Sequence, residues 1–137
     1  MNSKIESLLF SYLLKDNSLK VIFSDYEVKE ITDISWRYLL PGFILEKNNA
    51  ENLGTYLTNQ LKDQQTIFLS KYLTGKHDLL TIAKLFKEKS IEFTVMKGMA
   101  LTIGNIYKPG IRGSRDIDIL VNKQEIGSAY KALRSIG

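Results

Sequence analysis

Over residues 1–90, hydrophobic residues recur with the helical period of about 3.6 residues. The first hydrophobic stripe covers residues 5–13, and the second covers residues 25–38, where Asp25 is the expected N-cap. We expect Pro41 and the glycine after it to end the second helix, because proline and glycine interrupt helical patterns. The beginning of the chain is therefore predicted to be helical.

Two further stripes complete this helical region. Residues 52–72 form a long stripe, which Thr74 and Gly75 are expected to close. Asp78 is expected to cap one more helix before the pattern changes. The predicted inner face of that helix consists of Leu79, Ile82, Ala83, Leu85 and Phe86.

Strict alternation of β-favouring hydrophobic and other residues in 91–96 predicts a strand with one face in the core. Lys97 and Gly98 follow it, residues 99–107 suit a short buried helix, and residues 115–121 predict a second strand. Asn122 is expected to cap a last helix, with Glu125 as its capping-box partner. The predicted inner face of this helix consists of Ile126, Ala129, Tyr130, Leu133 and Ile136.

These elements predict an α+β fold, with a helical region over residues 1–90 and an αβ core over residues 91–137. The chain has 137 residues, and its 44% hydrophobic content is enough for a buried core. It has no cysteine and one histidine, which excludes disulfides, thiolate metal sites and histidine clusters. No hydrophobic run could cross a bilayer and no signal-peptide pattern is present, so we expect a soluble cytoplasmic protein.

The net charge of +4 comes from the last part of the chain, because basic and acidic residues balance over residues 1–96. Between residues 97 and 115 every charged residue is basic: Lys97, Lys108, Arg112 and Arg115. Such a segment attracts an anion such as a phosphate chain, although a solvated basic loop has the same composition. The helical region carries no net charge, which disfavours sequence-specific DNA binding.

Two carboxylates lie in the second predicted strand. Alternation places Asp116 and Asp118 on one face, about 7 Å apart at Cα, and Ile117 and Ile119 on the buried face. Paired carboxylates repel unless a cation lies between them, and hard divalent cations such as Mg²⁺ or Mn²⁺ prefer oxygen ligands. The alternative is an ordinary polar outer face of an amphipathic strand.

The turn after the first predicted strand, Lys97-Gly98, has the composition of an anion-binding turn. Lysine supplies a positive charge, and glycine lets a phosphate approach the backbone. A Lys-Gly turn is common and carries little weight alone. Beside Asp116 and Asp118, however, it would complete the layout that phosphoryl and nucleotidyl transfer require.

These residues resemble a known family, the uncharacterised nucleotidyltransferases of the polymerase-β-like superfamily. The shared pattern is a Lys-Gly turn, a Tyr, an Arg and an Asp-hydrophobic-Asp strand, here Lys97-Gly98, Tyr107, Arg112 and Asp116-Ile117-Asp118. The resemblance is good over residues 91–137. It implies a mixed αβ sheet, two Mg²⁺ ions, and transfer of a nucleoside monophosphate from a nucleoside triphosphate to an acceptor hydroxyl.

The resemblance also implies a role for each matching residue. Asp116 and Asp118 would be catalytic metal ligands, Lys97 and Gly98 would line the triphosphate site, and Arg112 would contact a phosphate or anchor its loop. The superfamily adds a third carboxylate on a later strand, which this sequence lacks. We therefore expect the N-terminal part of the family fold, weak or absent transfer, and an exposed sheet edge that contacts a second copy or another partner.

Three functions stay open on this reasoning. The first is an Mg²⁺-dependent nucleotidyltransferase whose acceptor is a small molecule, a protein or an RNA. The second is a module that binds a nucleotide or a protein without catalysis. The third is an Mn²⁺-dependent glycosyltransferase that uses Asp116 and Asp118 as its metal motif. None of the three involves a membrane.

Overall fold

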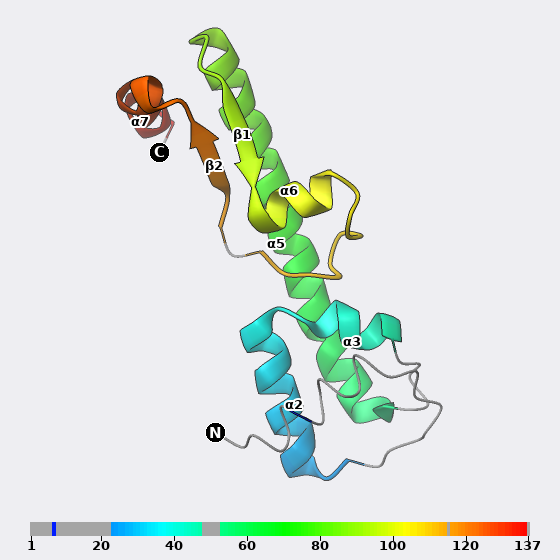
Figure 1. The fold of residues 1–137 in the computed structure, drawn as a ribbon. Coiled ribbons are helices and arrows are strands. Elements are labelled where there is room, and N and C mark those ends of the chain that lie inside the picture. The colour runs from blue at the N-terminus through cyan, green and yellow to red at the C-terminus, as the bar shows by residue number, and fades with distance from the viewer. Residues whose placement is uncertain (1–6, 8–22, 48–52, 115, 137) are drawn as a thin grey trace. The chain divides into compact units, whose positions relative to one another are not determined.

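The computed structural model describes residues 7, 23–47, 53–114 and 116–136, and the fold is α+β. In chain order the elements are α2 (Asp25–Tyr38), α3 (Pro41–Lys47), α5 (Thr55–Glu88), β1 (Phe93–Met96), α6 (Lys97–Ile103), β2 (Asp118–Val121), the 3₁₀ turn η1 (Lys123–Glu125) and α7 (Ile126–Arg134) (Figure 1). The predicted helix over residues 5–13 lies almost entirely outside the described residues. In the described ranges, no helix is long and hydrophobic enough to cross a bilayer.

Helix α2 has the predicted bounds but a different cap. Its N-cap is Ser24 rather than Asp25, and Ser24 forms a capping box with Glu27 in which each side chain accepts a backbone N–H of the other residue. The helix ends at Leu39, which is left-handed with a φ of 61°. Helix α2 therefore stops before Pro41, as predicted, and Pro41 itself begins α3, where its missing N–H is not needed.

The predicted helix end at Thr74 and Gly75 was wrong, because α5 continues through both residues for 34 residues in all. A long-range contact explains the glycine. A Cβ on Gly75 would lie 2.6 Å from Cε of Met99, so α6 approaches α5 more closely than a side chain would allow. Gly75 therefore permits close packing between helices, and its weak helix propensity of about 1 kcal/mol does not end the helix.

The chain forms two compact units, residues 1–69 with 108–113 and residues 70–107 with 114–137. This division falls within α5, whereas the predicted boundary at residue 90 is where helices give way to strands. The core of the first unit joins α2, α3 and the beginning of α5 through Val28, Ile31, Ile34, Ile44, Leu53, Leu57 and Leu61. Trp36 stacks on Phe68 beside it, with the ring centroids 4.9 Å apart.

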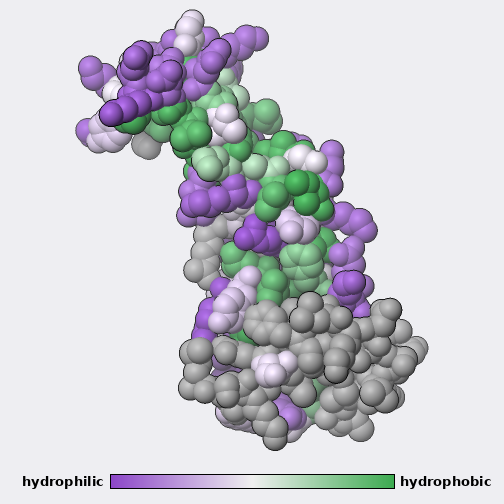
Figure 2. Space-filling view, viewed as in Figure 1, coloured by the Kyte–Doolittle hydropathy of each residue, from purple (hydrophilic) through white to green (hydrophobic). Residues whose placement is uncertain are grey.

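The second unit contains the sheet, in which β1 and β2 lie side by side and antiparallel (Figure 1). Phe93 pairs with Val121 and Met96 with Asp118. One face packs on a core made by Phe86, Ile91, Ala129 and Ala132. On the other face Met96 and Leu120 are exposed, and Figure 2 shows hydrophobic side chains gathered over the strands and α6.

Helix α7 completes this core after the predicted cap, Asn122, whose side chain accepts the backbone N–H of Gln124 as η1 begins. The predicted inner face is correct for Ala129, which is buried, and for Leu133, which packs on the core. It is wrong for Ile126, Tyr130 and Ile136, which are exposed. The helix is short, and two small residues, Ala129 and Ala132, bring its backbone close to the core.

Candidate functional site

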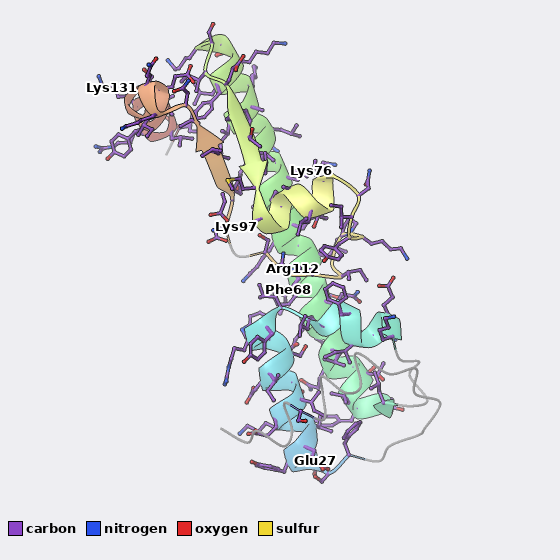
Figure 3. All side chains as sticks on the ribbon, viewed as in Figure 1. Glu27, Phe68, Lys76, Lys97, Arg112 and Lys131 are labelled. Carbon is purple, nitrogen blue, oxygen red and sulfur yellow. The ribbon has the colours of Figure 1, made fainter. Side chains whose placement is uncertain are left out.

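The two strands bring one lysine and one aspartate together. The register pairs Met96 with Asp118, so Lys97, which follows Met96, lies at the strand end where β2 begins. Lys97 Nζ donates a hydrogen bond to Asp118 Oδ1 at 2.8 Å and forms an ion pair with it (Figure 3 labels Lys97). The Lys97 side chain is 69% exposed and that of Asp118 is 29% exposed, so water and solutes can reach the pair.

The charge of Lys97 reflects both carboxylates. Its pKa is raised above the ordinary lysine value, first by the hydrogen bond to Asp118, then by the charge of Asp118, and to a smaller extent by the charge of Asp116. Two negative groups close to an ammonium favour its charged form. Lys97 and Asp118 are thus in direct contact, and the charge of Asp116 acts in the same direction. The metal and phosphate roles predicted for these residues stay predictions.

The backbone at Lys97 is unusual. The sequence predicts a Lys-Gly turn before a helix that starts at residue 99, but α6 begins at Lys97 itself and runs for only seven residues. Lys97 is left-handed with a φ of 55°, a conformation that residues with a side chain seldom adopt. Gly98, the second residue of α6, is half-buried. Backbone strain of this kind clusters at functional sites.

The two aspartates occupy different backbone environments. The predicted strand over residues 115–121 was too long, because Asp116 and Ile117 precede β2, which begins only at Asp118. Arg115 lies outside the described residues. Asp116 lies in a bend ahead of the strand with an exposed side chain, so strand alternation does not determine where it points. Ile117 and Ile119 are half-buried rather than fully buried, and Ile119 packs on the core.

Arg112 belongs to the first unit, within residues 108–113. The next residue, Gly113, donates its backbone N–H to the carbonyl oxygen of Leu39 at 3.3 Å, and a Cβ there would lie 3.1 Å from the ring of Phe68 (Figure 3 labels Arg112 and Phe68). These contacts anchor the Arg112 loop to α2 and α5. The predicted phosphate contact of Arg112 stays a prediction.

Beside Asp116, the second unit has a cavity of about 470 Å³. One wall is α5, and the other is formed by Met99 and the segment that leads into β2. A larger hollow of about 800 Å³ lies at the opposite end of the strands, around Phe93 and Val121, and none of the predicted site residues lines it. The cavity that concerns the carboxylates is therefore the smaller one.

Comparison with known protein families gives a match over most of the chain. The family of uncharacterised nucleotidyltransferases matches residues 39–137, which is well over half of the chain. The chain belongs to this family. No curated protein and no solved structure matches it. The family match confirms the resemblance predicted from the sequence and supports a general nucleotidyltransferase role.

In this nucleotidyltransferase the donor set near Lys97 suits a hard cation, because it consists of the carboxylate oxygens of Asp116 and Asp118. The positive charge of the Lys97 ammonium already partly compensates the negative charge of these carboxylates. Among the described ranges, no group of three or more His, Asp or Glu side chains could hold a metal. Any cation at Asp116 and Asp118 would need further ligands, such as substrate phosphate and water.

Sequence reasoning missed two charged residues of α5 that line the smaller cavity, Lys71 and Asp78. Asp78 was predicted only as the cap of a helix that would begin there. Because α5 continues through this position, Asp78 instead lines the cavity. The signal was present in the spacing: residues 71, 74, 75 and 78 fall on one face of a continuous helix. The shared face can be recognised only if one continuous helix through Gly75 is predicted.

Proposed function

We propose that this nucleotidyltransferase moves a nucleoside monophosphate from a nucleoside triphosphate to an acceptor hydroxyl with the help of Mg²⁺. The observation that carries the proposal is the contact of Lys97 with Asp118 beside the charge of Asp116. The lysine supplies a positive charge for a phosphate, and the two aspartates supply oxygen ligands for a metal. All three residues lie within the range that the family matches. Nucleotidyl transfer requires both parts.

The reaction conserves atoms and charge in one displacement. The acceptor oxygen forms a bond to the α-phosphorus, and the bond from that phosphorus to the oxygen shared with the β-phosphate breaks. Pyrophosphate leaves with the electron pair, and the acceptor proton is released to water. Negative charge builds up on the phosphate oxygens during this step, so positive groups that face them lower the barrier.

Each residue has a separate task in this scheme. Asp116 and Asp118 would hold the metal, which when bound would supply positive charge to the triphosphate and make the acceptor hydroxyl easier to deprotonate. Mn²⁺ accepts the same ligands. Lys97, with its exposed side chain, exchanges Asp118 for a triphosphate oxygen when the nucleotide arrives. The helix dipole contributes little, because α6 has only seven residues.

The test measures nucleotide binding by calorimetry and pyrophosphate release from ATP, each with Mg²⁺. Asp116→Asn and Asp118→Asn should lose Mg²⁺-dependent binding, and Lys97→Ala should bind ATP more weakly with Mg²⁺ present or absent. Glu88→Gln, which removes an exposed carboxylate at the end of α5, is the matched control and should behave like the parent. Equal ATP affinity in all five proteins would refute the proposed site.

A second candidate is a module that binds the nucleotide without transferring it. The absence of a third carboxylate near the pair, in the part of the chain that the structure describes, favours it. Two carboxylates hold metal loosely, and a misplacement of about 1 Å can slow a reaction by ~100-fold. Tight Mg²⁺-ATP binding with no pyrophosphate release would identify the binding module, whereas slow release that the aspartate variants abolish would identify the transferase.

A further inference from the structure

The cavity of about 470 Å³ beside Asp116 is lined by α5, by Met99 of α6 and by the segment that leads into β2. Along α5 its residues lie at 70, 71, 74, 75 and 78, which is one face of a helix. The opposite wall is made by Met99 and by residues 114, 116 and 117. All of these residues belong to the second unit.

The lining combines a small hydrophobic part with a polar part. Gly75, the buried Met99 and the half-buried Ile117 form the hydrophobic part. Because Gly75 has no side chain, Met99 can lie directly against it. The polar part consists of Ser70, Lys71, Thr74, Asp78, Ser114 and Asp116. Ser114 is held in place, since its hydroxyl donates to the carbonyl oxygen of Asp116 at 3.0 Å.

Asp116 connects the cavity to the proposed catalytic group. It lines the cavity and its charge also acts on Lys97, which in turn contacts Asp118. A molecule in the cavity would therefore lie next to the carboxylates that are proposed to position the metal and the nucleotide. An acceptor hydroxyl needs this adjacency, because it must reach the α-phosphorus.

We infer that this cavity binds the acceptor, and that the acceptor is a small molecule that carries several hydroxyl groups. The inference rests on the proposed function and names the substrate of the same site. The hydroxyls of Ser70 and Thr74 offer donors and acceptors, and the two carboxylates and the hydroxyl oxygen of Ser114 offer further acceptors, which is what a polyhydroxylated molecule needs. The hydrophobic part can pack against its C–H face.

The size and charge of the cavity oppose a polymeric acceptor. Its volume lies within the range of about 300–1,000 Å³ that is usual for small-molecule sites. The lining contains two carboxylates, Asp78 and Asp116, and one lysine, Lys71, so its own charge does not favour the phosphates of an RNA end. A protein hydroxyl would arrive with a bulky backbone around it.

The first experiment is a transfer assay with ATP labelled at the α-phosphate and three kinds of acceptor: a mixture of glucose, glucosamine and myo-inositol, a short RNA, and unfolded casein. Label should appear on a member of the first group. Thr74→Phe fills the cavity from an exposed position and should lower this transfer by ~100-fold with unchanged ATP affinity. Thr81→Phe, at an exposed position of α5 outside the cavity, is the matched control and should transfer like the parent.

A second measurement does not depend on turnover. Because the chain has no cysteine, Thr74→Cys and Thr81→Cys each introduce a single thiol whose labelling rate with a maleimide can be followed. With Mg²⁺ and a non-hydrolysable ATP analogue present, the mixture of small hydroxylated molecules should slow labelling at position 74 and leave position 81 unchanged.

Each outcome decides between the proposals. Label on RNA or casein, equal transfer by Thr74→Phe and Thr81→Phe, or no protection at position 74 would overturn the assignment of the cavity. Protection at position 74 supports it even where transfer is too slow to detect. If the parent does not bind ATP, the proposed function is refuted rather than the assignment of the cavity. The protection measurement is then repeated without nucleotide, and slower labelling at position 74 would still support a binding site in the cavity.

Discussion

Replacement of Phe86 by alanine should reveal how firmly the sheet is held. Phe86 has no exposed surface and lies at the centre of the core of the second unit. Its ring meets that of Phe93, the first residue of β1, edge to face with centroids 5.4 Å apart. Phe86→Ala removes this pair and leaves a cavity, which together should cost about 3–5 kcal/mol of unfolding free energy.

This loss should also reach the candidate site. Phe93 and Ile119 pack on the same core; β1, which contains Phe93, ends next to Lys97, and β2, which contains Ile119, begins at Asp118. A loosened core therefore lets the two strand ends separate. In Phe86→Ala the Lys97 ammonium should lose its contact with Asp118, so its pKa should fall toward the ordinary lysine value.

Urea denaturation followed by far-UV circular dichroism gives the free energy, and NMR titration of the Lys97 ammonium gives its pKa. Leu61→Ala is the matched control, because Leu61 is equally buried but lies in the core of the first unit. It should cost about 2–5 kcal/mol and leave the Lys97 pKa unchanged. A loss below about 1 kcal/mol in Phe86→Ala would refute the reasoning, since a ring so enclosed cannot be removed without that penalty.

Three further predictions follow from single contacts. Ser24→Ala should destabilise the chain by about 1 kcal/mol in thermal unfolding through loss of the capping box, and Ser24→Asp should restore most of it. Asp118→Asn should lower the Lys97 pKa, because it removes the charge that favours the protonated lysine. In the parent the ion pair is complete at neutral pH and is lost only as the pH rises through the raised Lys97 pKa. A Lys97 pKa that NMR titration finds unchanged in the variant would contradict the assigned contact. Gly113→Ala should lower the melting temperature, because a Cβ 3.1 Å from the buried ring of Phe68 must displace it; an unchanged value would show that the ring gives way freely.

Local signals in the sequence were enough for several elements. Hydrophobic periodicity gives the bounds of α2, and alternation locates β1 to within two residues. The buried Phe86 was predicted on the inner face of its helix. Lys97 does lie beside Asp118, as the sequence pattern suggested, whereas the metal and phosphate roles of these residues stay predictions.

Other features depend on contacts between distant residues. A glycine such as Gly75 is found both at helix ends and where another helix packs closely, so the local sequence does not distinguish the two. The contact with Met99, far along the chain, shows that close packing is the reason here. Alternation likewise placed Asp116 on a strand, but β2 pairs only from Asp118, where β1 ends. The cavity was invisible for the same reason, since its walls come from separate parts of the sequence.

The continuity of α5 has a consequence for how this protein can be divided. The helix gives Leu61 to one core and Phe86 to the other, so a single element of secondary structure belongs to both units. A cut at residue 90, where the helices give way to strands, would deprive β1 of the ring that it packs against. Any fragment, chimera or recombined gene that is meant to retain the carboxylate pair must therefore begin before residue 70, inside what the sequence pattern presents as the helical region.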